Sequence, residues 1–142
     1  MLDLLPSLYQ QATVPQAVVD ELKEGRAQGI NLPDILILPW MQVKAVREEA
    51  LLGLATDLGR GERQVLALTI QTSDSLALLD DGLARQYARL IGIAFTGTLG
   101  VLLKAKQTGY LIVLSPLLDQ LERLRFRLDS DTRQAVLKLA GE

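Results

Sequence analysis

Three acidic residues, Glu21, Glu62 and Asp80, lie at positions in the predicted elements where a carboxylate could bind a cation. Asp80 directly follows an apolar stretch, at the tip of a predicted strand, and it is not needed to start the next helix. Glu21 lies three residues after Val18, within the apolar stripe of its predicted helix, where a carboxylate costs free energy unless it is paired or binds a cation. Glu62 opens its own predicted helix in register with Val65. Convergent carboxylates of this kind predict a site for a hard divalent cation.

Two of these carboxylates also have an ordinary structural interpretation. Glu21 is equally compatible with a solvated place at the edge of its apolar stripe. Glu62 fits an acid in the first turn of a helix, where the macrodipole attracts negative charge, and taken singly this is its better interpretation. The three acids together favour a shared site, although their spacing is not a local motif.

The composition narrows the chemistry further. The chain has 142 residues and a net charge of −2, and it contains neither cysteine nor histidine. These absences exclude a disulfide framework, a thiolate zinc site, a thiol nucleophile, a Ser-His-Asp triad and an imidazole base. Carboxylate donors favour magnesium or manganese. A pair of such ions about 4 Å apart would activate a water and stabilise the leaving oxygen of a phosphodiester.

Short apolar strands alternate with helices along the chain. Hydrophobic period, glycine and proline predict strands at 12–14, 41–46, 76–79 and 93–95, and helices at 2–8, 15–25, 48–58, 62–72, 81–90, 98–108, 116–124 and 130–139. Residues 25–39 are predicted to be mostly loop. This order is typical of an α/β fold with a mainly parallel sheet. Residues 1–142 are predicted to form one domain, with 114–142 as its C-terminal helical part.

Polar residues follow two of the predicted strands. Asp80-Asp81 comes after one strand and Thr96-Gly97-Thr98 after the next, so both groups are expected at the same rim of the sheet, where α/β proteins bind ligands. Capping of the following helix is the favoured interpretation of Asp81 and Thr98. Asp81 is also a candidate metal ligand, and Thr96 or Thr98 a candidate for placing water or phosphate.

Arginines gather in two places. Those near the predicted rim are Arg60, Arg63, Arg85 and Arg89. Of these, Arg60 and Arg85 are the candidates for binding substrate phosphates. The alternating arginines of residues 123–127 are interpreted as a solvated edge.

Several other classes of protein are disfavoured. The sequence has no G-x-x-x-x-G-K-[ST] phosphate loop and no G-x-G-x-x-G after a strand. Its mild acidity disfavours broad, non-specific binding to nucleic acid but does not exclude a nucleic-acid substrate. The most apolar run, 90–103, is shorter than the roughly 20 residues that a membrane span needs, and no signal peptide is visible. We therefore expect a cytoplasmic protein with no membrane partner.

Four segments, in this order, resemble the PIN-domain family, specifically a prokaryotic branch similar to the toxin ribonucleases of toxin–antitoxin modules. They are Val14-Pro15-x-Ala17-Val18 leading to Glu21-Leu22, Leu58-Gly59-x-Gly61-Glu62, Leu78-Leu79-Asp80-Asp81, and Thr96-Gly97-Thr98-Leu99-Gly100-Val101-Leu102. The resemblance runs from about residue 2 to residue 142. It implies a three-layer α/β/α fold and a metal-dependent endoribonuclease with acidic ligands at Glu21, Glu62 and Asp80. It also implies an antitoxin partner and a homodimer.

Family members open with a strand that ends in an aspartate, within an Asp-Thr/Ser-Ser-Pro-like motif. The sequence shows no such motif ahead of residues 2–5, and Asp3 is not at a strand tip. We therefore expect either that the first strand has been lost through a misassigned or cut start, or that the chain is a degenerate, inactive member.

Three functions follow from these observations. The first is a Mg²⁺- or Mn²⁺-dependent ribonuclease that uses Glu21, Glu62 and Asp80. The second is an inactive PIN-like module that binds protein partners. The third and weakest is a small-nucleotide-binding protein that uses Asp80 and the turn at 96–100.

Overall fold

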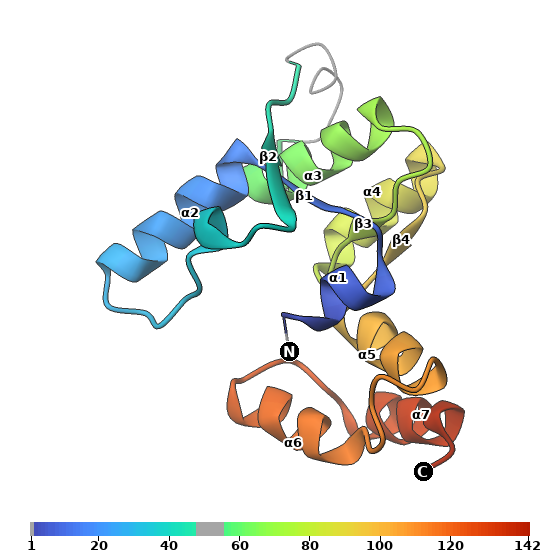
Figure 1. Ribbon diagram of the computed structural model, residues 1–142. Helices are drawn as coiled ribbons and strands as arrows, with labels where there is room; N and C mark the ends of the chain where they lie inside the picture. The colour runs from blue at the N-terminus through green and yellow to red at the C-terminus, as the bar shows by residue number, and fades with distance from the viewer. Residues whose placement is uncertain (1, 48–55) are drawn as a thin grey trace. The chain divides into compact units, whose positions relative to one another are not determined.

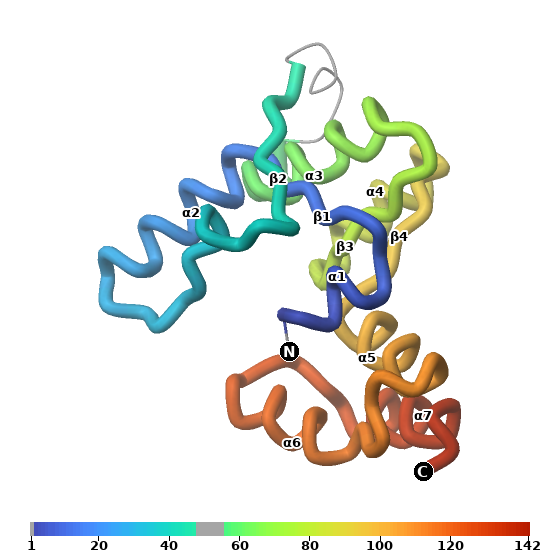
Figure 2. The backbone as a smooth tube through the Cα atoms, viewed as in Figure 1, coloured from blue at the N-terminus to red at the C-terminus, as the bar shows by residue number. Residues whose placement is uncertain are grey.

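A computed structural model describes residues 2–47 and 56–142 (Figure 1). Its contacts divide the chain into two compact units. We call Tyr9–Gly97 the sheet unit, and residues 2–8 together with Thr98–Glu142 the helical unit. The tube in Figure 2 follows the chain through both units in sequence order.

The sheet unit alternates strands and helices. Its elements are β1 (Ala12–Pro15), α2 (Gln16–Ala27), the 3-10 helix η1 (Ile35–Ile37), β2 (Met41–Lys44), α3 (Arg60–Gln71), β3 (Ala77–Leu78), α4 (Gly82–Ile91) and β4 (Phe95–Thr96). The strands form two parallel pairs, β1 with β2 and β3 with β4, rather than one continuous sheet in the described residues. The predicted α/β class and the parallel strand pairing are confirmed.

Helix α3 contacts strands of both pairs, β1 and β3. Its Leu66 is fully buried and packs in a cluster with Leu58, Leu79 and Ala88. A second cluster forms around Val19 of α2 on the other strand pair. Burial of this apolar surface is the main source of stability for such short strands, since an isolated two-stranded ladder is marginal in water.

Helix α4 is capped at both ends. Asp81 at its N-cap accepts a hydrogen bond from the backbone N–H of Ala84 at 2.8 Å. Gly92 ends the helix in the left-handed region, at φ +78°, which glycine adopts without steric cost. The predicted capping role of Asp81 is confirmed.

The helical unit contains α1 (Leu4–Leu8), α5 (Thr98–Gln107), α6 (Ser115–Arg123) and α7 (Ser130–Ala140). Leu102, Leu114 and Leu118 form its buried centre. The side chain of Glu142 accepts hydrogen bonds from the backbone N–H groups of Leu114 at 2.5 Å and Ser115 at 3.1 Å, at the start of α6. Carboxylates are favourable at a helix N-terminus, so this contact ties the segment that follows α7 to the start of α6.

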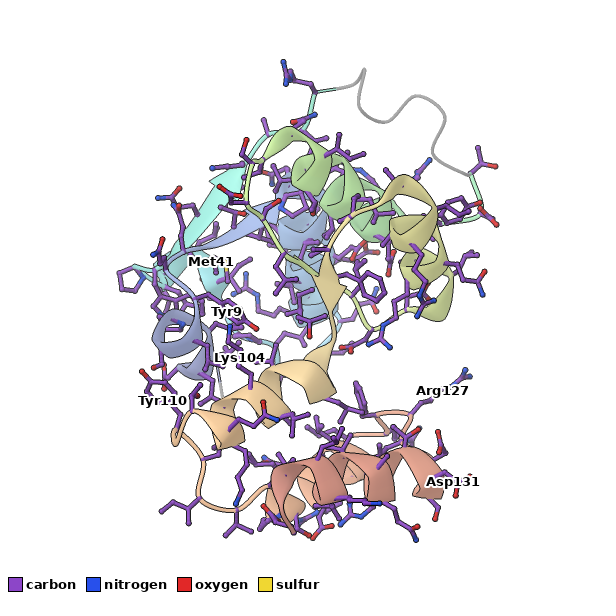
Figure 3. The ribbon with its side chains drawn as sticks, turned by 90° about the vertical axis from the view of Figure 1, so that its right-hand side faces the viewer. Tyr9, Met41, Lys104, Tyr110, Arg127 and Asp131 are labelled. Carbon is purple, nitrogen blue, oxygen red and sulfur yellow. The ribbon has the colours of Figure 1, made fainter. Side chains whose placement is uncertain are left out.

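The arginines of residues 123–127 are exposed, as the solvated-edge interpretation predicts. The side chain of Arg127 extends outward from the helical unit (Figure 3). Phe126 and Leu128, which alternate with these arginines, pack toward the apolar centre.

Most predicted elements are present, and their ends lie within two residues of the predicted bounds. The segment 25–39 is less irregular than predicted, because α2 continues to Ala27 and η1 follows. The helix predicted at 48–58 falls largely outside the described residues. Among the helices that are described, none has the length and apolar character to cross a membrane.

Candidate carboxylate site

Helices α2 and α3 cap each other through their side chains. The carboxylate of Glu21, on α2, accepts a hydrogen bond from the backbone N–H of Gly61 at 3.1 Å, in the first turn of α3. In return, the side-chain oxygen of Gln64, on α3, accepts one from the backbone N–H of Ala17 at 2.9 Å, in the first turn of α2. The first N–H groups of a helix have no partner within the helix, so each side chain satisfies a donor that would otherwise be unpaired.

Gly61 leaves the space in which the Glu21 carboxylate lies. A Cβ atom at position 61 would sit 2.8 and 2.9 Å from the two carboxylate oxygens of Glu21. Gly61 is buried, whereas Glu21 is exposed. Of the two interpretations of Glu21, a carboxylate within the apolar stripe or a solvated one at its edge, the structure has the second. Glu21 is exposed, and its carboxylate is hydrogen-bonded to the backbone of α3.

Glu62 lies in the first turn of α3, half-buried, with its carboxylate against Gly59. The carboxylates of Glu21 and Glu62 thus both lie at the N-terminal turn of one helix, against glycines two residues apart. Arg60, in the same turn, pairs with Asp20 at 3.4 Å. The helix dipole favours negative charge here, so the turn retains acidic side chains that face water.

Asp80 lies at the shared carboxyl end of β3 and β4. The parallel register pairs Leu78 with Thr96, so the residues that follow each strand emerge at the same rim, as predicted. Asp80 is exposed and Thr96 is half-buried. Thr98 begins α5 in the helical unit, and its role at the rim stays a prediction.

Arg85 is bound to the same rim through two groups. Its Nε donates a hydrogen bond to the carbonyl of Leu79 at 2.8 Å, and its Nη2 lies 3.6 Å from Oδ1 of Asp80. A Cβ atom at Gly97 would collide with Arg85 Nη2 and would lie 2.8 Å from Asp80 Oδ1. The absence of a side chain at position 97 therefore makes room for the Arg85–Asp80 pair.

Tyr87 connects α4 to the segment before α3. Its hydroxyl donates a hydrogen bond to the carboxylate of Asp57 at 3.1 Å. Burial, followed by the neighbouring Asp57 carboxylate, raises the pKa of Tyr87 above its usual value. The neutral phenol of Tyr87 therefore donates to Asp57 and positions the residues just before Gly59.

The chemistry of the donor set fits a hard divalent cation. The candidate ligands are carboxylates that reach solvent, and Mg²⁺ is commonly bound through one or two carboxylates while it keeps several waters. Glu21 and Glu62 gather at α3, and Asp80 lies at the rim of β3 and β4. Across residues 2–47 and 56–142, no three acidic side chains come close enough together to form a complete cage. The ligand roles of Glu21, Glu62, Asp80 and Asp81 stay predictions.

The sequence analysis gave no positioning role to three residues that shape the candidate site. Gly61 and Gly97 were named only as parts of longer segments, and Gln64 was not named at all. Gly97, between two threonines after a strand, carried a readable signal, because glycine there indicates a close backbone approach. Gln64 carried none, since its partner Ala17 lies 47 residues away.

Comparison with known protein families identifies the class. A family model described as a PIN domain matches residues 1–142. The chain therefore belongs to the PIN-domain family, whose members are associated with nuclease activity and generally depend on divalent metal ions. Searches of curated proteins and of solved structures found no match.

Proposed function

We propose that this protein is a Mg²⁺- or Mn²⁺-dependent endoribonuclease. The observation that carries the proposal is the placement of two carboxylates, Glu21 and Glu62, at the first turn of α3, in a chain of the PIN-domain family. Glu21, Glu62 and Asp80 would hold the cation, with Asp81 beside them. When bound, it would supply an activated water and stabilise the leaving oxygen of a phosphodiester.

The chain's own residues would bind and orient the substrate. Only Nε of Arg85 donates to the Leu79 carbonyl. The Nη groups of the guanidinium would donate hydrogen bonds to a phosphate oxygen. Thr96, at the same rim, would place a water or a phosphate through its hydroxyl. Arg60 reaches solvent next to Glu62 and would contact a neighbouring phosphate of the strand.

The biological role that we propose is that of a toxin in a toxin–antitoxin pair. The support is the resemblance of the segment 96–102 to that branch of the family. In this role the protein would act on RNA in the cytoplasm, pair with a small antitoxin and form a homodimer.

The proposal is tested by cleavage of a labelled single-stranded RNA. The purified chain is expected to cut the RNA when Mg²⁺ or Mn²⁺ is present and to stop when the ions are chelated. A single-stranded DNA of the same sequence serves as the control for substrate class. Absence of any metal-dependent cleavage of the RNA would reject the proposal.

A non-catalytic binding module is the second candidate. Asp80 is already paired with Arg85, and Glu21 already accepts a backbone hydrogen bond, so both carboxylates have a structural use without a cation. The helical unit also exposes large apolar side chains, with Ile112 at 86% and Leu124 at 71%. Scattered exposed apolar residues are common, but these two suit a protein partner. Light scattering that finds a monomer, with no co-purifying partner, would count against this candidate.

A further inference from the structure

Arg85 is bound more firmly to the backbone than to Asp80. Its Nε donates to the Leu79 carbonyl at 2.8 Å, which is a normal hydrogen-bond length. Its Nη2 lies 3.6 Å from Asp80 Oδ1, longer than the 2.7–2.9 Å of a strong charge-assisted bond. The guanidinium is therefore anchored at the rim by one nitrogen, while its contact with Asp80 is loose.

The anchor does not depend on Asp80. The Leu79 carbonyl belongs to the backbone at the end of β3, and Arg85 lies in the first half of α4, whose start is fixed by the Asp81 cap. If Asp80 acquired another counter-ion, Arg85 would keep its place at the rim. Only the Nη groups would change partner.

Asp80 is also open to a competitor. Its side chain is 40% exposed and that of Arg85 is 34% exposed, so the pair reaches solvent from both sides. Exposed ion pairs of this kind are weak. A divalent cation carries twice the charge of a guanidinium, and carboxylate oxygens are ligands that Mg²⁺ takes in proteins, so such a cation can compete with Arg85 for Asp80.

We propose that Arg85 is an exchangeable counter-ion of Asp80. Without a cation it neutralises the carboxylate. With a cation at Asp80, the Nη groups are released for a phosphate oxygen of the RNA while Nε stays on the Leu79 carbonyl. Arg85 is thus a positioning residue that orders cation binding before RNA binding. This inference rests on the proposed function, because it takes Asp80 as a cation ligand.

The test is the affinity for Mn²⁺ in solution, measured by calorimetry without RNA. Arg85→Gln removes the competing charge and should tighten Mn²⁺ binding roughly two- to fivefold, the range of an exposed ion pair. Arg89→Gln is the matched control. Arg89 lies one turn further along α4, and its guanidinium carbon is 5.2 Å from the centroid of the Phe95 ring rather than next to Asp80. This variant should leave Mn²⁺ affinity unchanged.

Asp80→Asn separates this inference from the proposed function. If Asp80→Asn weakens Mn²⁺ binding but Arg85→Gln does not tighten it, Asp80 is a cation ligand and the proposed exchange of Arg85 is wrong. If Asp80→Asn leaves Mn²⁺ binding unchanged, Asp80 is not a ligand, and the proposed exchange is wrong as well. Should Arg85→Gln not fold, NMR of the wild-type chain gives the answer. Saturating Mg²⁺ should shift the Nη–Hη signals of Arg85, which lose Asp80 as a partner, and not those of Arg89. Unshifted Nη–Hη signals of Arg85 would overturn the inference.

Discussion

The carboxylate of Glu21 accepts a hydrogen bond from the backbone N–H of Gly61, 40 positions along the chain, and occupies the space that a side chain at position 61 would fill. One contact therefore fixes the register between α2 and α3 and brings Glu21 to the turn that carries Glu62. The capping bond of Gln64 to Ala17 runs the other way between the same two helices. Together these bonds set the geometry of the candidate site.

Gly61→Ala tests the space beside Glu21. Alanine is normally the better helix former, by about 1 kcal/mol, but its Cβ here would displace the Glu21 carboxylate from the backbone N–H. Gly82→Ala is the matched control, because no atom lies within 4 Å of the added Cβ at that first position of α4. By urea unfolding, we expect the position-61 variant to be about 1–2 kcal/mol less stable than the position-82 variant. Equal stability would show that Glu21 does not depend on the glycine.

Substitutions of Glu21 distinguish a structural role from a ligand role. Glu21→Gln keeps an acceptor oxygen for the Gly61 N–H, so stability should fall by less than in Glu21→Ala, which loses the cap at a cost of about 1 kcal/mol. A ligand role adds a second effect, because the amide lacks the negative charge that binds a hard cation. We expect Glu21→Gln to retain the fold and weaken Mn²⁺ binding. Unchanged Mn²⁺ affinity would leave only the capping role.

Asp81 is expected to act on stability more than on chemistry. Asparagine is as good an N-cap as aspartate, so Asp81→Asn should unfold at nearly the wild-type urea concentration, while Asp81→Ala should cost about 0.5–2 kcal/mol. Because Asp81→Asn also removes the charge, RNA cleavage by this variant reports directly on the predicted ligand role. Full activity would remove Asp81 from the ligand set, and strong loss with an intact fold would retain it.

Glu142 should make the stability of the helical unit depend on pH. Hydrogen bonds from the backbone N–H of Leu114, then of Ser115, and the nearby Lys106 at 3.2 Å lower the pKa of the Glu142 side chain below its usual 4.5. The folded state therefore binds its proton less tightly than the unfolded state. The stabilisation is complete above pH 4.5 and is lost as the pH falls through the lowered pKa.

We expect Glu142→Gln to be less stable than the wild type at pH 7. Below pH 4.5 its stability should fall less steeply than that of the wild type. Urea unfolding at pH 7 and at pH 3 measures both effects. Glu24→Gln, on the exposed face of α2, is the control and should leave the decline unchanged. An identical pH profile for the wild type and Glu142→Gln would contradict the assignment.

The sequence predicted those features of the fold that depend on residues close together in the chain. Asp81 indicated the start of α4, and short apolar runs indicated the strands. The shared rim of Asp80 and Thr96 also followed, because parallel strands place their carboxyl ends together. The cap and the strands depend only on residues within a turn or a strand, and the rim depends only on the parallel direction of β3 and β4.

Contacts between distant residues were not predictable in the same way. The pairing of Glu21 with Gly61 and of Gln64 with Ala17 spans 40 and 47 positions, and nothing in either local pattern encodes the partner. The pairing of Arg85 with Asp80 is closer in sequence, yet it depends on the missing side chain at Gly97. The division of the strands into two pairs likewise depends on tertiary packing around α3.

The most direct test of the account is Mg²⁺-dependent cleavage of a labelled single-stranded RNA by the wild type, Glu62→Gln and Asp80→Asn, with unchanged circular dichroism as the check on folding. Each substitution replaces a carboxylate by an amide of the same shape. The account predicts that the wild type cleaves the RNA and that both variants lose cleavage by at least about a hundredfold. Cleavage by either variant at the wild-type rate would contradict the assignment of these carboxylates to the active site.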